Sequence, residues 1–326
     1  MDVYRLFKLM SDRSSHNKRI AKNTLFLYLR MGLVLVVSLF STRVVLQALD
    51  IEDYGINNVV SGFVTMFAFL NTSMSNGVQR FYNFSLGRKN GYSIKDVYNT
   101  ALQIQAILAV TLLVPLETFG MWYIHTQMVI PIDRFAAAQW VFQFSVLSLV
   151  LLVLQIPYSA AIMAYEKMDY YAYLSIFDVL AKLGIAYIIK YTTFDKLILY
   201  GALNMLVSLI CFFLYYGYAK SHFQDLKSDF IIRKQLFKPM LYFSGWNGFG
   251  SFAYMIKSQG LNMLLNVFFG PVVNAARGVS NMAMSAIQGF QSNIVIAFRP
   301  QLIQSYATGD NERVLKLSLI HISEPT

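Results

Sequence analysis

The chain has 326 residues, of which 56% are hydrophobic and only 13% are charged, and its formal net charge is +10. A soluble domain carries about 25% charged residues, so this composition and a mean hydropathy of +0.47 exclude an ordinary soluble protein. A basic soluble protein would suggest nucleic acid as a partner. Here most Lys and Arg residues lie between apolar blocks, so we expect a lipid bilayer as the partner and no nucleic acid.

The apolar residues form blocks of roughly 20, long enough to cross a hydrocarbon core. We predict an all-α integral membrane protein. The chain should hold about eight spanning helices, at residues 24–47, 55–79, 97–118, 138–163, 170–190, 197–219, 241–268 and 273–298. Pro157 should kink or end the fourth span. Gly270 and Pro271 should form the turn between the last two spans.

Lys and Arg are distributed unevenly between the two sets of connecting segments. With the N-terminus in the cytoplasm, nineteen lie on the cytoplasmic side and four on the other side. The positive-inside rule therefore predicts a cytoplasmic N-terminus. The first apolar stretch is too long for the core of a signal peptide, which indicates a first transmembrane helix that is retained.

A weak internal repeat relates the first and seventh spans, and the segments that follow the second and eighth spans, at an offset of about 220 residues. It predicts two six-helix lobes. We expect a basic cytoplasmic N-terminus (1–23), an N-terminal lobe (24–219), a cytoplasmic linker (220–240) and the first two helices of an incomplete second lobe (241–317). Residues 318–326 are expected to be a non-native tail, with a natural terminus as the alternative.

Polar residues recur at helical spacing in three spans. They include Asn58, Ser61, Thr65 and Thr72 in the second span, Asn247, Ser251 and Asn262 in the seventh, and Asn281 and Gln288 in the eighth. Lipid cannot satisfy such groups. Hydrogen bonds between helices explain any single residue, whereas three long stripes favour a water-filled cavity.

Charged residues inside the spans are costly in lipid and are candidates for function. The cationic candidates for substrate binding are Arg30, Arg43, Lys257 and Arg277. The arginines could also extend to the membrane surface. Asp178 and Lys182 lie four residues apart and form either a structural salt bridge or a coupling pair. A cationic cavity would suit a phosphate-bearing substrate.

Signatures of enzymes are absent from the sequence. The four His residues have no metal-ligand spacing, and neither a Walker loop nor a dinucleotide-binding motif occurs. We therefore expect no catalytic residues, no metal site, no cofactor and no enzymatic activity.

Four segments resemble the polysaccharide-biosynthesis and O-antigen flippases: 17–24 (NKRIAKNT), 42–49 (TRVVLQAL), 53–56 (DYGI) and 80–90 (RFYNFSLGRKN). These flippases belong to the superfamily that also holds the multidrug and toxin extruders. The resemblance implies a MATE-like fold with two six-helix lobes around a central cavity, in the bacterial cytoplasmic membrane. It also implies a cationic cavity that binds the pyrophosphate of a polyprenyl-linked oligosaccharide, alternating access, and H⁺ or Na⁺ as a possible coupling ion.

The function expected from the sequence is thus to flip a lipid-linked oligosaccharide from the inner to the outer leaflet. A cation-coupled multidrug exporter of the same fold is the first alternative, and it would favour carboxylates in the cavity. A membrane glycosyltransferase or polysaccharide polymerase would need a large external loop, and the longest external segment, about 118–137, is short for this role.

Overall fold

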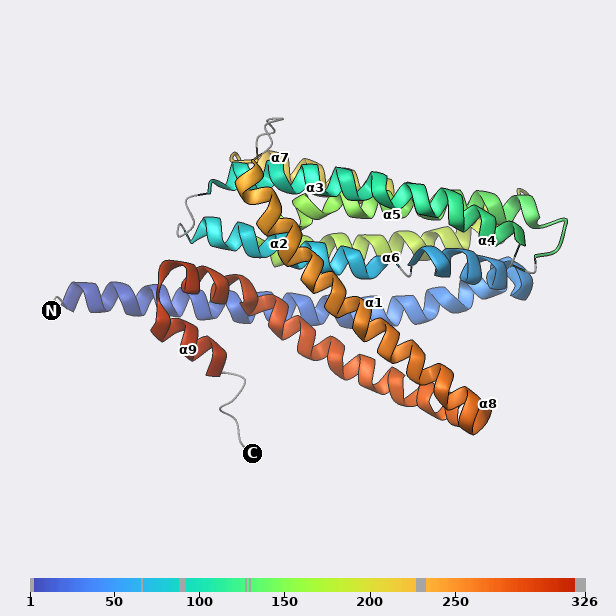
Figure 1. The fold of residues 1–326 in the computed structure, drawn as a ribbon. Helices are drawn as coiled ribbons and strands as arrows, with labels where there is room; N and C mark the ends of the chain where they lie inside the picture. The colour runs from blue at the N-terminus through green and yellow to red at the C-terminus, as the bar shows by residue number, and fades with distance from the viewer. Residues whose placement is uncertain are drawn as a thin grey trace.

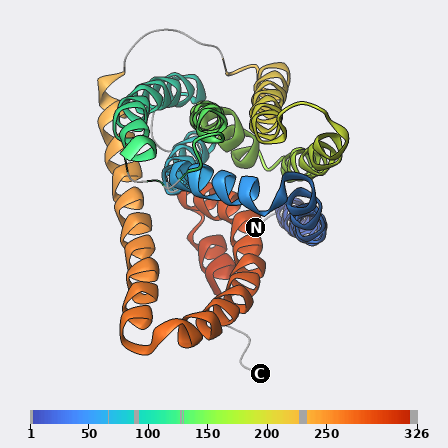
Figure 2. The same cartoon turned by 90° about the vertical axis from the view of Figure 1, so that its right-hand side faces the viewer.

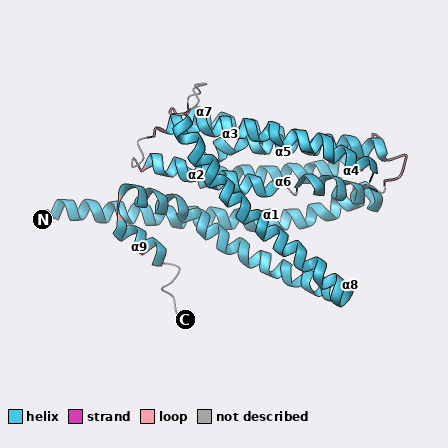
Figure 3. Cartoon of the chain, viewed as in Figure 1, coloured by secondary structure: helices cyan, strands magenta, loops and turns pink. Residues whose placement is uncertain are grey.

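The structure, a computed structural model, describes residues 3–65, 67–87, 92–126, 128, 130–226 and 233–319. Side chains are described from Asn23 onward, except at scattered positions in 51–68, at most positions in 255–290 and beyond Leu315. The described residues form helices and no strand (Figures 1 and 3). The α-helices are α1 (Val3–Thr65), α2 (Ala68–Leu86), α3 (Ile94–Pro115), α4 (Met121–Thr126), α5 (Phe135–Ala164), α6 (Met168–Tyr191), α7 (Lys196–His222), α8 (Lys234–Thr308) and α9 (Asn311–Leu319). The predicted all-α class is confirmed.

Five stretches of helix among the described residues are long and apolar enough to cross a membrane. They are Asn23–Asp50, Ile94–Thr126, Phe135–Ala164, Met168–Tyr191 and Lys196–His222. Many large apolar side chains on their outer faces are exposed, among them Leu29, Val36 and Leu39 of α1. A face of this kind is stable in lipid and unfavourable in water, in agreement with an integral membrane protein.

The first predicted turn lies inside the long helix α1. Asp50 has φ 65° and ψ 168°, so the chain turns there and then re-enters the bundle. Residues other than glycine rarely adopt this combination of φ and ψ. The second predicted span, 55–79, is not one helix. It consists of the last part of α1 and of α2, which meet at Phe67, and it continues to Leu86.

One expectation about a helix end is wrong. The third span does not end near residue 118. A π-helical turn (Leu116–Gly120) and α4 extend it to Thr126, so much of the expected external segment is helical. The fourth helix, α5, runs through Pro157 to Ala164, in agreement with the predicted span 138–163. The carbonyl of Pro157 accepts a hydrogen bond from Tyr82 Oη at 3.3 Å, which connects α5 to α2.

The seventh and eighth predicted spans are two arms of one helix, α8, which doubles back on itself in its middle (Figures 1 and 2). We call residues 234–254 its first arm and residues 284–308 its second arm. Both arms pack against α2: Ser251 of the first arm and Gln304 of the second arm each contact it. The bend lies away from the other helices in both views. The predicted turn residues, Gly270 and Pro271, lie outside the part whose side chains are described.

One end of the bundle carries many basic side chains, and we call it the basic end. It holds the end of α2, the start of α3, the turn between α5 and α6, the end of α7 and the start of α8 (Figure 1). Its basic residues include Arg80, Lys95, Lys167, Lys220, Arg233 and Arg313. We call the other end, which holds Asp50, Arg134 and Asp195, the opposite end. Arg80 was expected in a loop but lies in α2, where its guanidinium is 4.1 Å from the centre of the Phe243 ring.

α2 and the second arm of α8 contact each other through residues that the sequence repeat makes equivalent. Gln304 Nε2 donates to Asn83 Oδ1 at 3.3 Å, and these residues are 221 positions apart. A Cβ on Gly87 would lie 2.4 Å from the Cβ of Ala307. Around a two-fold axis, equivalent residues meet each other only close to the axis. These contacts occur at the offset of the predicted repeat, and the two-lobe organisation itself stays a prediction.

Other contacts of α8 occur in matched pairs. Ser73 of α2 lies against Ser251 of the first arm, with their Oγ atoms 3.1 Å apart. The pair related to it by the repeat also makes contact. Asn293 and Met31 each lie about 220 residues from one member of the first pair, and Asn293 Nδ2 is 3.0 Å from Met31 Sδ. A two-fold arrangement requires that if i contacts j, the equivalents of i and j also make contact.

Candidate transport chamber

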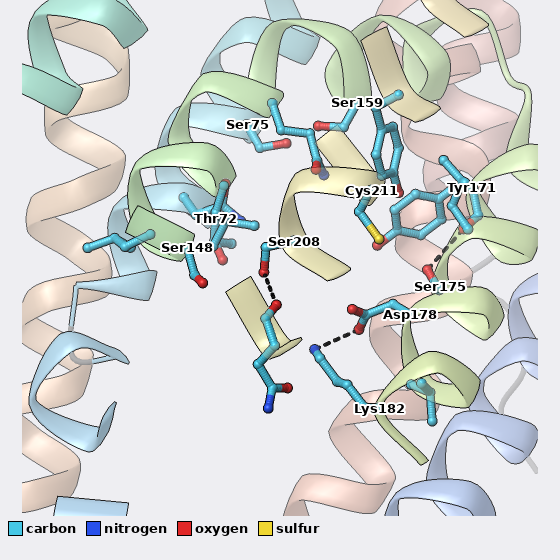
Figure 4. A pocket seen from close by; sticks show the side chains of 18 of the residues that line it. Thr72, Ser75, Ser148, Ser159, Tyr171, Ser175, Asp178, Lys182, Ser208 and Cys211 are labelled. Carbon is cyan, nitrogen blue, oxygen red and sulfur yellow. Dashed lines mark hydrogen bonds and ion pairs between the residues drawn. The ribbon is translucent and has the colours of Figure 1, made fainter. Parts of the chain in front are cut away.

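A cavity of about 900 Å³ lies inside the bundle. Helices α1, α2, α5, α6 and α7 form most of its wall, and Ile296 and Arg299 of α8 complete it. We call this cavity the chamber. Figure 4 shows side chains from α2, α5, α6 and α7 pointing into the same space. The outer faces of these helices are apolar, whereas the chamber wall carries both polar and apolar side chains.

The wall of the chamber is built from stripes of residues at helical spacing. Residues three and four positions apart lie on one face of a helix, and each helix presents one such face to the cavity. The stripes are Ser145, Ser148, Leu152, Gln155 and Ser159 on α5; Tyr171, Ser175, Asp178 and Lys182 on α6; and Gly201, Asn204, Ser208, Cys211 and Tyr215 on α7. Hydroxyl and amide groups dominate these faces.

Arg30 of α1 connects three helices at the chamber wall. Its Nη1 donates to Ser175 Oγ of α6 at 3.4 Å, and its Nη2 donates to Asn293 Oδ1 of α8 at 3.2 Å. Its guanidinium also lies 5.0 Å from the centre of the Tyr171 ring, within the range of a cation–π interaction. A second guanidinium, that of Arg299 in α8, donates to Asn76 Oδ1 of α2.

The charges of the chamber are of two kinds. Lys182 Nζ lies 2.8 Å from Asp178 Oδ2, so this pair is locally neutral (Figure 4). The two arginines are bound by neutral acceptors, and among the described residues neither forms an ion pair with a carboxylate. The chamber therefore has a cationic character that comes from Arg30 and Arg299.

Two buried donors of the chamber lack a hydrogen-bond acceptor in the described structure. They are Nε of Arg30 and Nε2 of Gln79, whose side chain is almost fully buried. Buried polar atoms are nearly always hydrogen-bonded in folded proteins. Both atoms are buried, so an acceptor in the chamber can reach them only after their side chains move.

Five of the residues predicted from the sequence line the chamber: Arg30, Ser61, Thr72, Asp178 and Lys182. The others with described side chains do not. Arg43, Asn58, Lys257 and Gln288 are exposed, and Asn247 and Ser251 are half-buried at the contact of α8 with its neighbours. The side chains of Thr65, Asn262, Arg277 and Asn281 lie outside the described part. All of these residues remain predicted lining residues of a cavity that α8 would face.

Asn57 takes the place in the chamber that the sequence analysis gave to Asn58. The predicted stripe treated the second span as one straight helix, and the break at Phe67 invalidates that assumption. Arg299 was not among the predicted residues, because the eighth predicted span ended at residue 298, whereas α8 continues to Thr308. The stripes on α5, α6 and α7 were also not predicted. Their signal, polar residues three or four positions apart in an apolar run, was the same one used for the second span.

A second polar cluster lies at the opposite end. Arg134, which precedes α5, binds both carboxylate oxygens of Asp53, with Nε 2.7 Å from Oδ1, and its Nη1 lies 2.7 Å from Asp195 Oδ2. Hydrogen bonding to Asp53 raises the pKa of Arg134. Burial by itself would raise the pKa of Asp195, but the amides of Ile198 and Leu197 and the charge of Arg134 outweigh it and lower that pKa. Asp195 also caps α7.

No protein-family model and no curated protein matches the chain in sequence. Solved structures are similar to it in fold. One is an outward-facing multidrug resistance MATE family transporter of the MOP superfamily, with a TM-score of 0.75 and 13% identity over 93% of this chain and 68% of that one. Another is a MOP superfamily transporter from Pyrococcus furiosus, described as having a binding pocket of reverse polarity, with a TM-score of 0.69 and 12% identity over 92% and 68%.

A Vibrio cholerae MATE transporter in its bent form is also similar, with a TM-score of 0.68 and 16% identity over 93% of this chain and 69% of that one. At this level of identity the likeness shows the fold. The chain therefore has a MATE-like fold, as expected from the sequence, and it spans about two thirds of the length of these transporters.

Proposed function

We propose that this protein is a membrane transporter that flips a polyprenyl-pyrophosphate-linked oligosaccharide from the inner to the outer leaflet of the bacterial cytoplasmic membrane. The observation that carries the proposal is the cationic chamber. Among the described residues its two arginines donate hydrogen bonds to neutral side chains. A pyrophosphate offers acceptor oxygens to both arginines, and guanidinium groups bind phosphate in a bidentate manner.

The rest of the chamber wall suits the sugar part of such a substrate. Ser and Asn side chains on α2, α5 and α7 provide donors and acceptors that can exchange hydrogen bonds with sugar hydroxyls. The lipid tail would stay in the bilayer, because drawing it into a polar chamber would expose apolar surface to water. The protein would then need no covalent chemistry, only alternating exposure of the chamber to the two sides.

The arrangement of α8 supports the second requirement. Its arms contact α2 and the turn between α5 and α6 at the basic end, whereas its bend lies away from the bundle (Figure 2). If the N-terminus is cytoplasmic, as the distribution of Lys and Arg predicts, this structure is closed toward the cytoplasm and opens outward. Asp178, with Lys182, is the candidate site for a coupling ion such as H⁺ or Na⁺.

A cation-coupled multidrug exporter is the second candidate. It is favoured by the Asp178 carboxylate, which faces the chamber (Figure 4), and by the similarity in fold to proteins described as multidrug transporters. The arginines weigh against it, because a cationic drug would be repelled by guanidinium groups that have no carboxylate partner.

The experiment that separates these functions is complementation of surface-polysaccharide export in a flippase-null strain by the complete gene product of the native locus. Rescue should be lost with Arg30→Ala and Arg299→Ala. It should be kept with Lys190→Ala, which removes an exposed cation of α6 that does not line the chamber. Failure to rescue, together with raised drug resistance of the host, would instead establish the exporter function.

A further inference from the structure

The two chamber arginines are held in a reciprocal manner across one interface. Arg30 of α1 donates to Asn293 of α8, and Arg299 of α8 donates to Asn76 of α2. The second arm of α8 thus provides the guanidinium of Arg299 and the amide of Asn293. α1 provides the guanidinium of Arg30, and α2 provides the amide of Asn76. All described hydrogen bonds of this set lie on the side of the chamber where α8 closes the basic end.

An amide oxygen is a replaceable partner for an arginine. Hydrogen bonds from a guanidinium to an ionised acceptor are about twice as strong as those between neutral groups. An anion with several oxygens would therefore displace Asn293 from Arg30 and Asn76 from Arg299.

We propose that these two Arg–Asn pairs form a lock that a pyrophosphate group releases. While the chamber is empty, the pairs hold the second arm of α8 against α1 and α2 and seal the basic end. When a pyrophosphate binds the arginines, both pairs break and α8 is free to move away. By the same equilibrium, the lock closes behind a substrate that leaves toward the opposite end. This inference rests on the proposed function, because it requires a pyrophosphate in the chamber.

The lock can be tested at a contact that is not part of it. Gln304 of the second arm is hydrogen-bonded to Asn83 of α2 at 3.3 Å, so cysteines introduced as Asn83→Cys and Gln304→Cys can be joined by a short bifunctional thiol reagent. The native Cys211 is replaced by Cys211→Ser in this background. The rate of cross-linking, measured in lipid nanodiscs, then reports whether the second arm of α8 remains docked on α2.

Pyrophosphate should slow this cross-linking about tenfold, since the exchange of a neutral for a charged acceptor is of that order. One set of samples receives inorganic pyrophosphate, and a second set contains a polyprenyl pyrophosphate in the nanodisc. Slower cross-linking in both sets supports the lock with a lipid-linked ligand. Slowing with inorganic pyrophosphate alone supports the lock but contradicts a lipid-linked substrate.

Substitutions of the asparagines give the second test. Asn76→Asp and Asn293→Asp provide permanent carboxylate partners, so cross-linking should be fast and insensitive to pyrophosphate. Asn293→Leu removes one acceptor, so cross-linking should be slow even without the anion. Gln291→Glu adds the same charge to an exposed position of the same arm and should behave like the double-cysteine parent.

Direct binding of labelled pyrophosphate distinguishes the two proposals. If pyrophosphate binds and cross-linking does not change, the lock is overturned while the anionic chamber stands. If pyrophosphate does not bind the parent protein, both the lock and the proposed function fail. If the Asn→Asp variants respond to pyrophosphate as the parent does, the asparagines are not the displaced groups and the lock is rejected.

Discussion

Arg134 connects three parts of the chamber wall through one side chain. It binds Asp53 in the last part of α1 and Asp195 at the start of α7, and it directly precedes α5. These three helices line the chamber. The cluster therefore fixes the distances between their ends at the opposite end of the bundle, where the chain has no other described ion pair.

Loss of this cluster should destabilise the protein in a pH-dependent way. The pKa of Asp195 is lowered below its usual 3.8, so its stabilising effect is complete above that value and is lost as the pH falls through the lowered pKa. Arg134→Gln should cost about 1 kcal/mol at neutral pH, since the groups are partly exposed. Thermal unfolding from pH 7 to pH 3 should show a lower Tm for the variant and a smaller loss of Tm in acid.

Asp195→Asn is the matched variant, because asparagine caps a helix as well as aspartate does but carries no charge. It should reproduce the weakened acid dependence while α7 keeps its cap. A parent protein whose Tm falls in acid as steeply as that of Arg134→Gln would show that the ion pairs contribute nothing measurable.

At the scale of single helices, the contact of α2 with α8 depends on glycine. The chain at Gly87 has an ordinary φ of −74°, so glycine is needed there for space and not for backbone conformation. An added Cβ would lie 2.4 Å from the Cβ of Ala307 and 3.1 Å from the carbonyl oxygen of Gln304. Close approach of helices through small residues is a general device of membrane proteins.

Gly87→Ala should therefore push the second arm of α8 away from α2. We expect destabilisation of about 1–3 kcal/mol, the usual cost of overpacking, and slower cross-linking between the cysteines of Asn83→Cys and Gln304→Cys. Gly217→Ala is the control, since nothing lies within 4 Å of a Cβ there and alanine favours a helix over glycine. Equal Tm values for the two variants would contradict the close contact.

The sequence predicted the single helices well where a long apolar run determines them. α6 (Met168–Tyr191) and α7 (Lys196–His222) agree with the predicted spans 170–190 and 197–219 within three residues. The break at Phe67, the extension into α4 and the continuation of α8 past residue 299 were missed. Hydropathy locates the membrane, but hydrogen bonds and packing decide where a helix bends or continues outside it.

The chamber could be predicted in type and only partly in place. A cationic, polar cavity was expected, and Arg30 lies in it, but Lys257 is exposed and Arg299 is the second arginine. Which polar face meets which other face depends on the crossing of helices far apart in the chain. The sequence contains that information only through the repeat, whose equivalent residues Asn83 and Gln304 touch in the structure.

At the scale of the whole molecule, the two ends of the chamber differ. At the basic end, both arms of α8 contact α2, and the turn between α5 and α6 joins them, because Gln301 of α8 donates to Glu166 at 3.1 Å. Toward the opposite end, α8 diverges from the bundle (Figures 1 and 2). Access to the chamber should therefore be from the opposite end.

Cys211 provides a test of this asymmetry without any added cysteine. It is the single cysteine of the chain and it lines the chamber on α7 (Figure 4). With a cytoplasmic N-terminus, a membrane-impermeant thiol reagent should modify Cys211 about tenfold faster from outside than from inside, as expected when the two access states differ by about 1.4 kcal/mol. The measurement compares right-side-out with inside-out vesicles, and Cys211→Ser gives the background.

The side from which Cys211 is modified faster shows which end of the chamber is accessible. Faster modification from the cytoplasmic side would mean either that the chain has the reverse orientation or that the basic end is open in the membrane. A protease site placed before Asn23 separates these two cases, because it reports the side of the N-terminus independently of the chamber. If the N-terminus is cytoplasmic and modification is still faster from inside, the contacts of α8 with α2 do not seal the basic end.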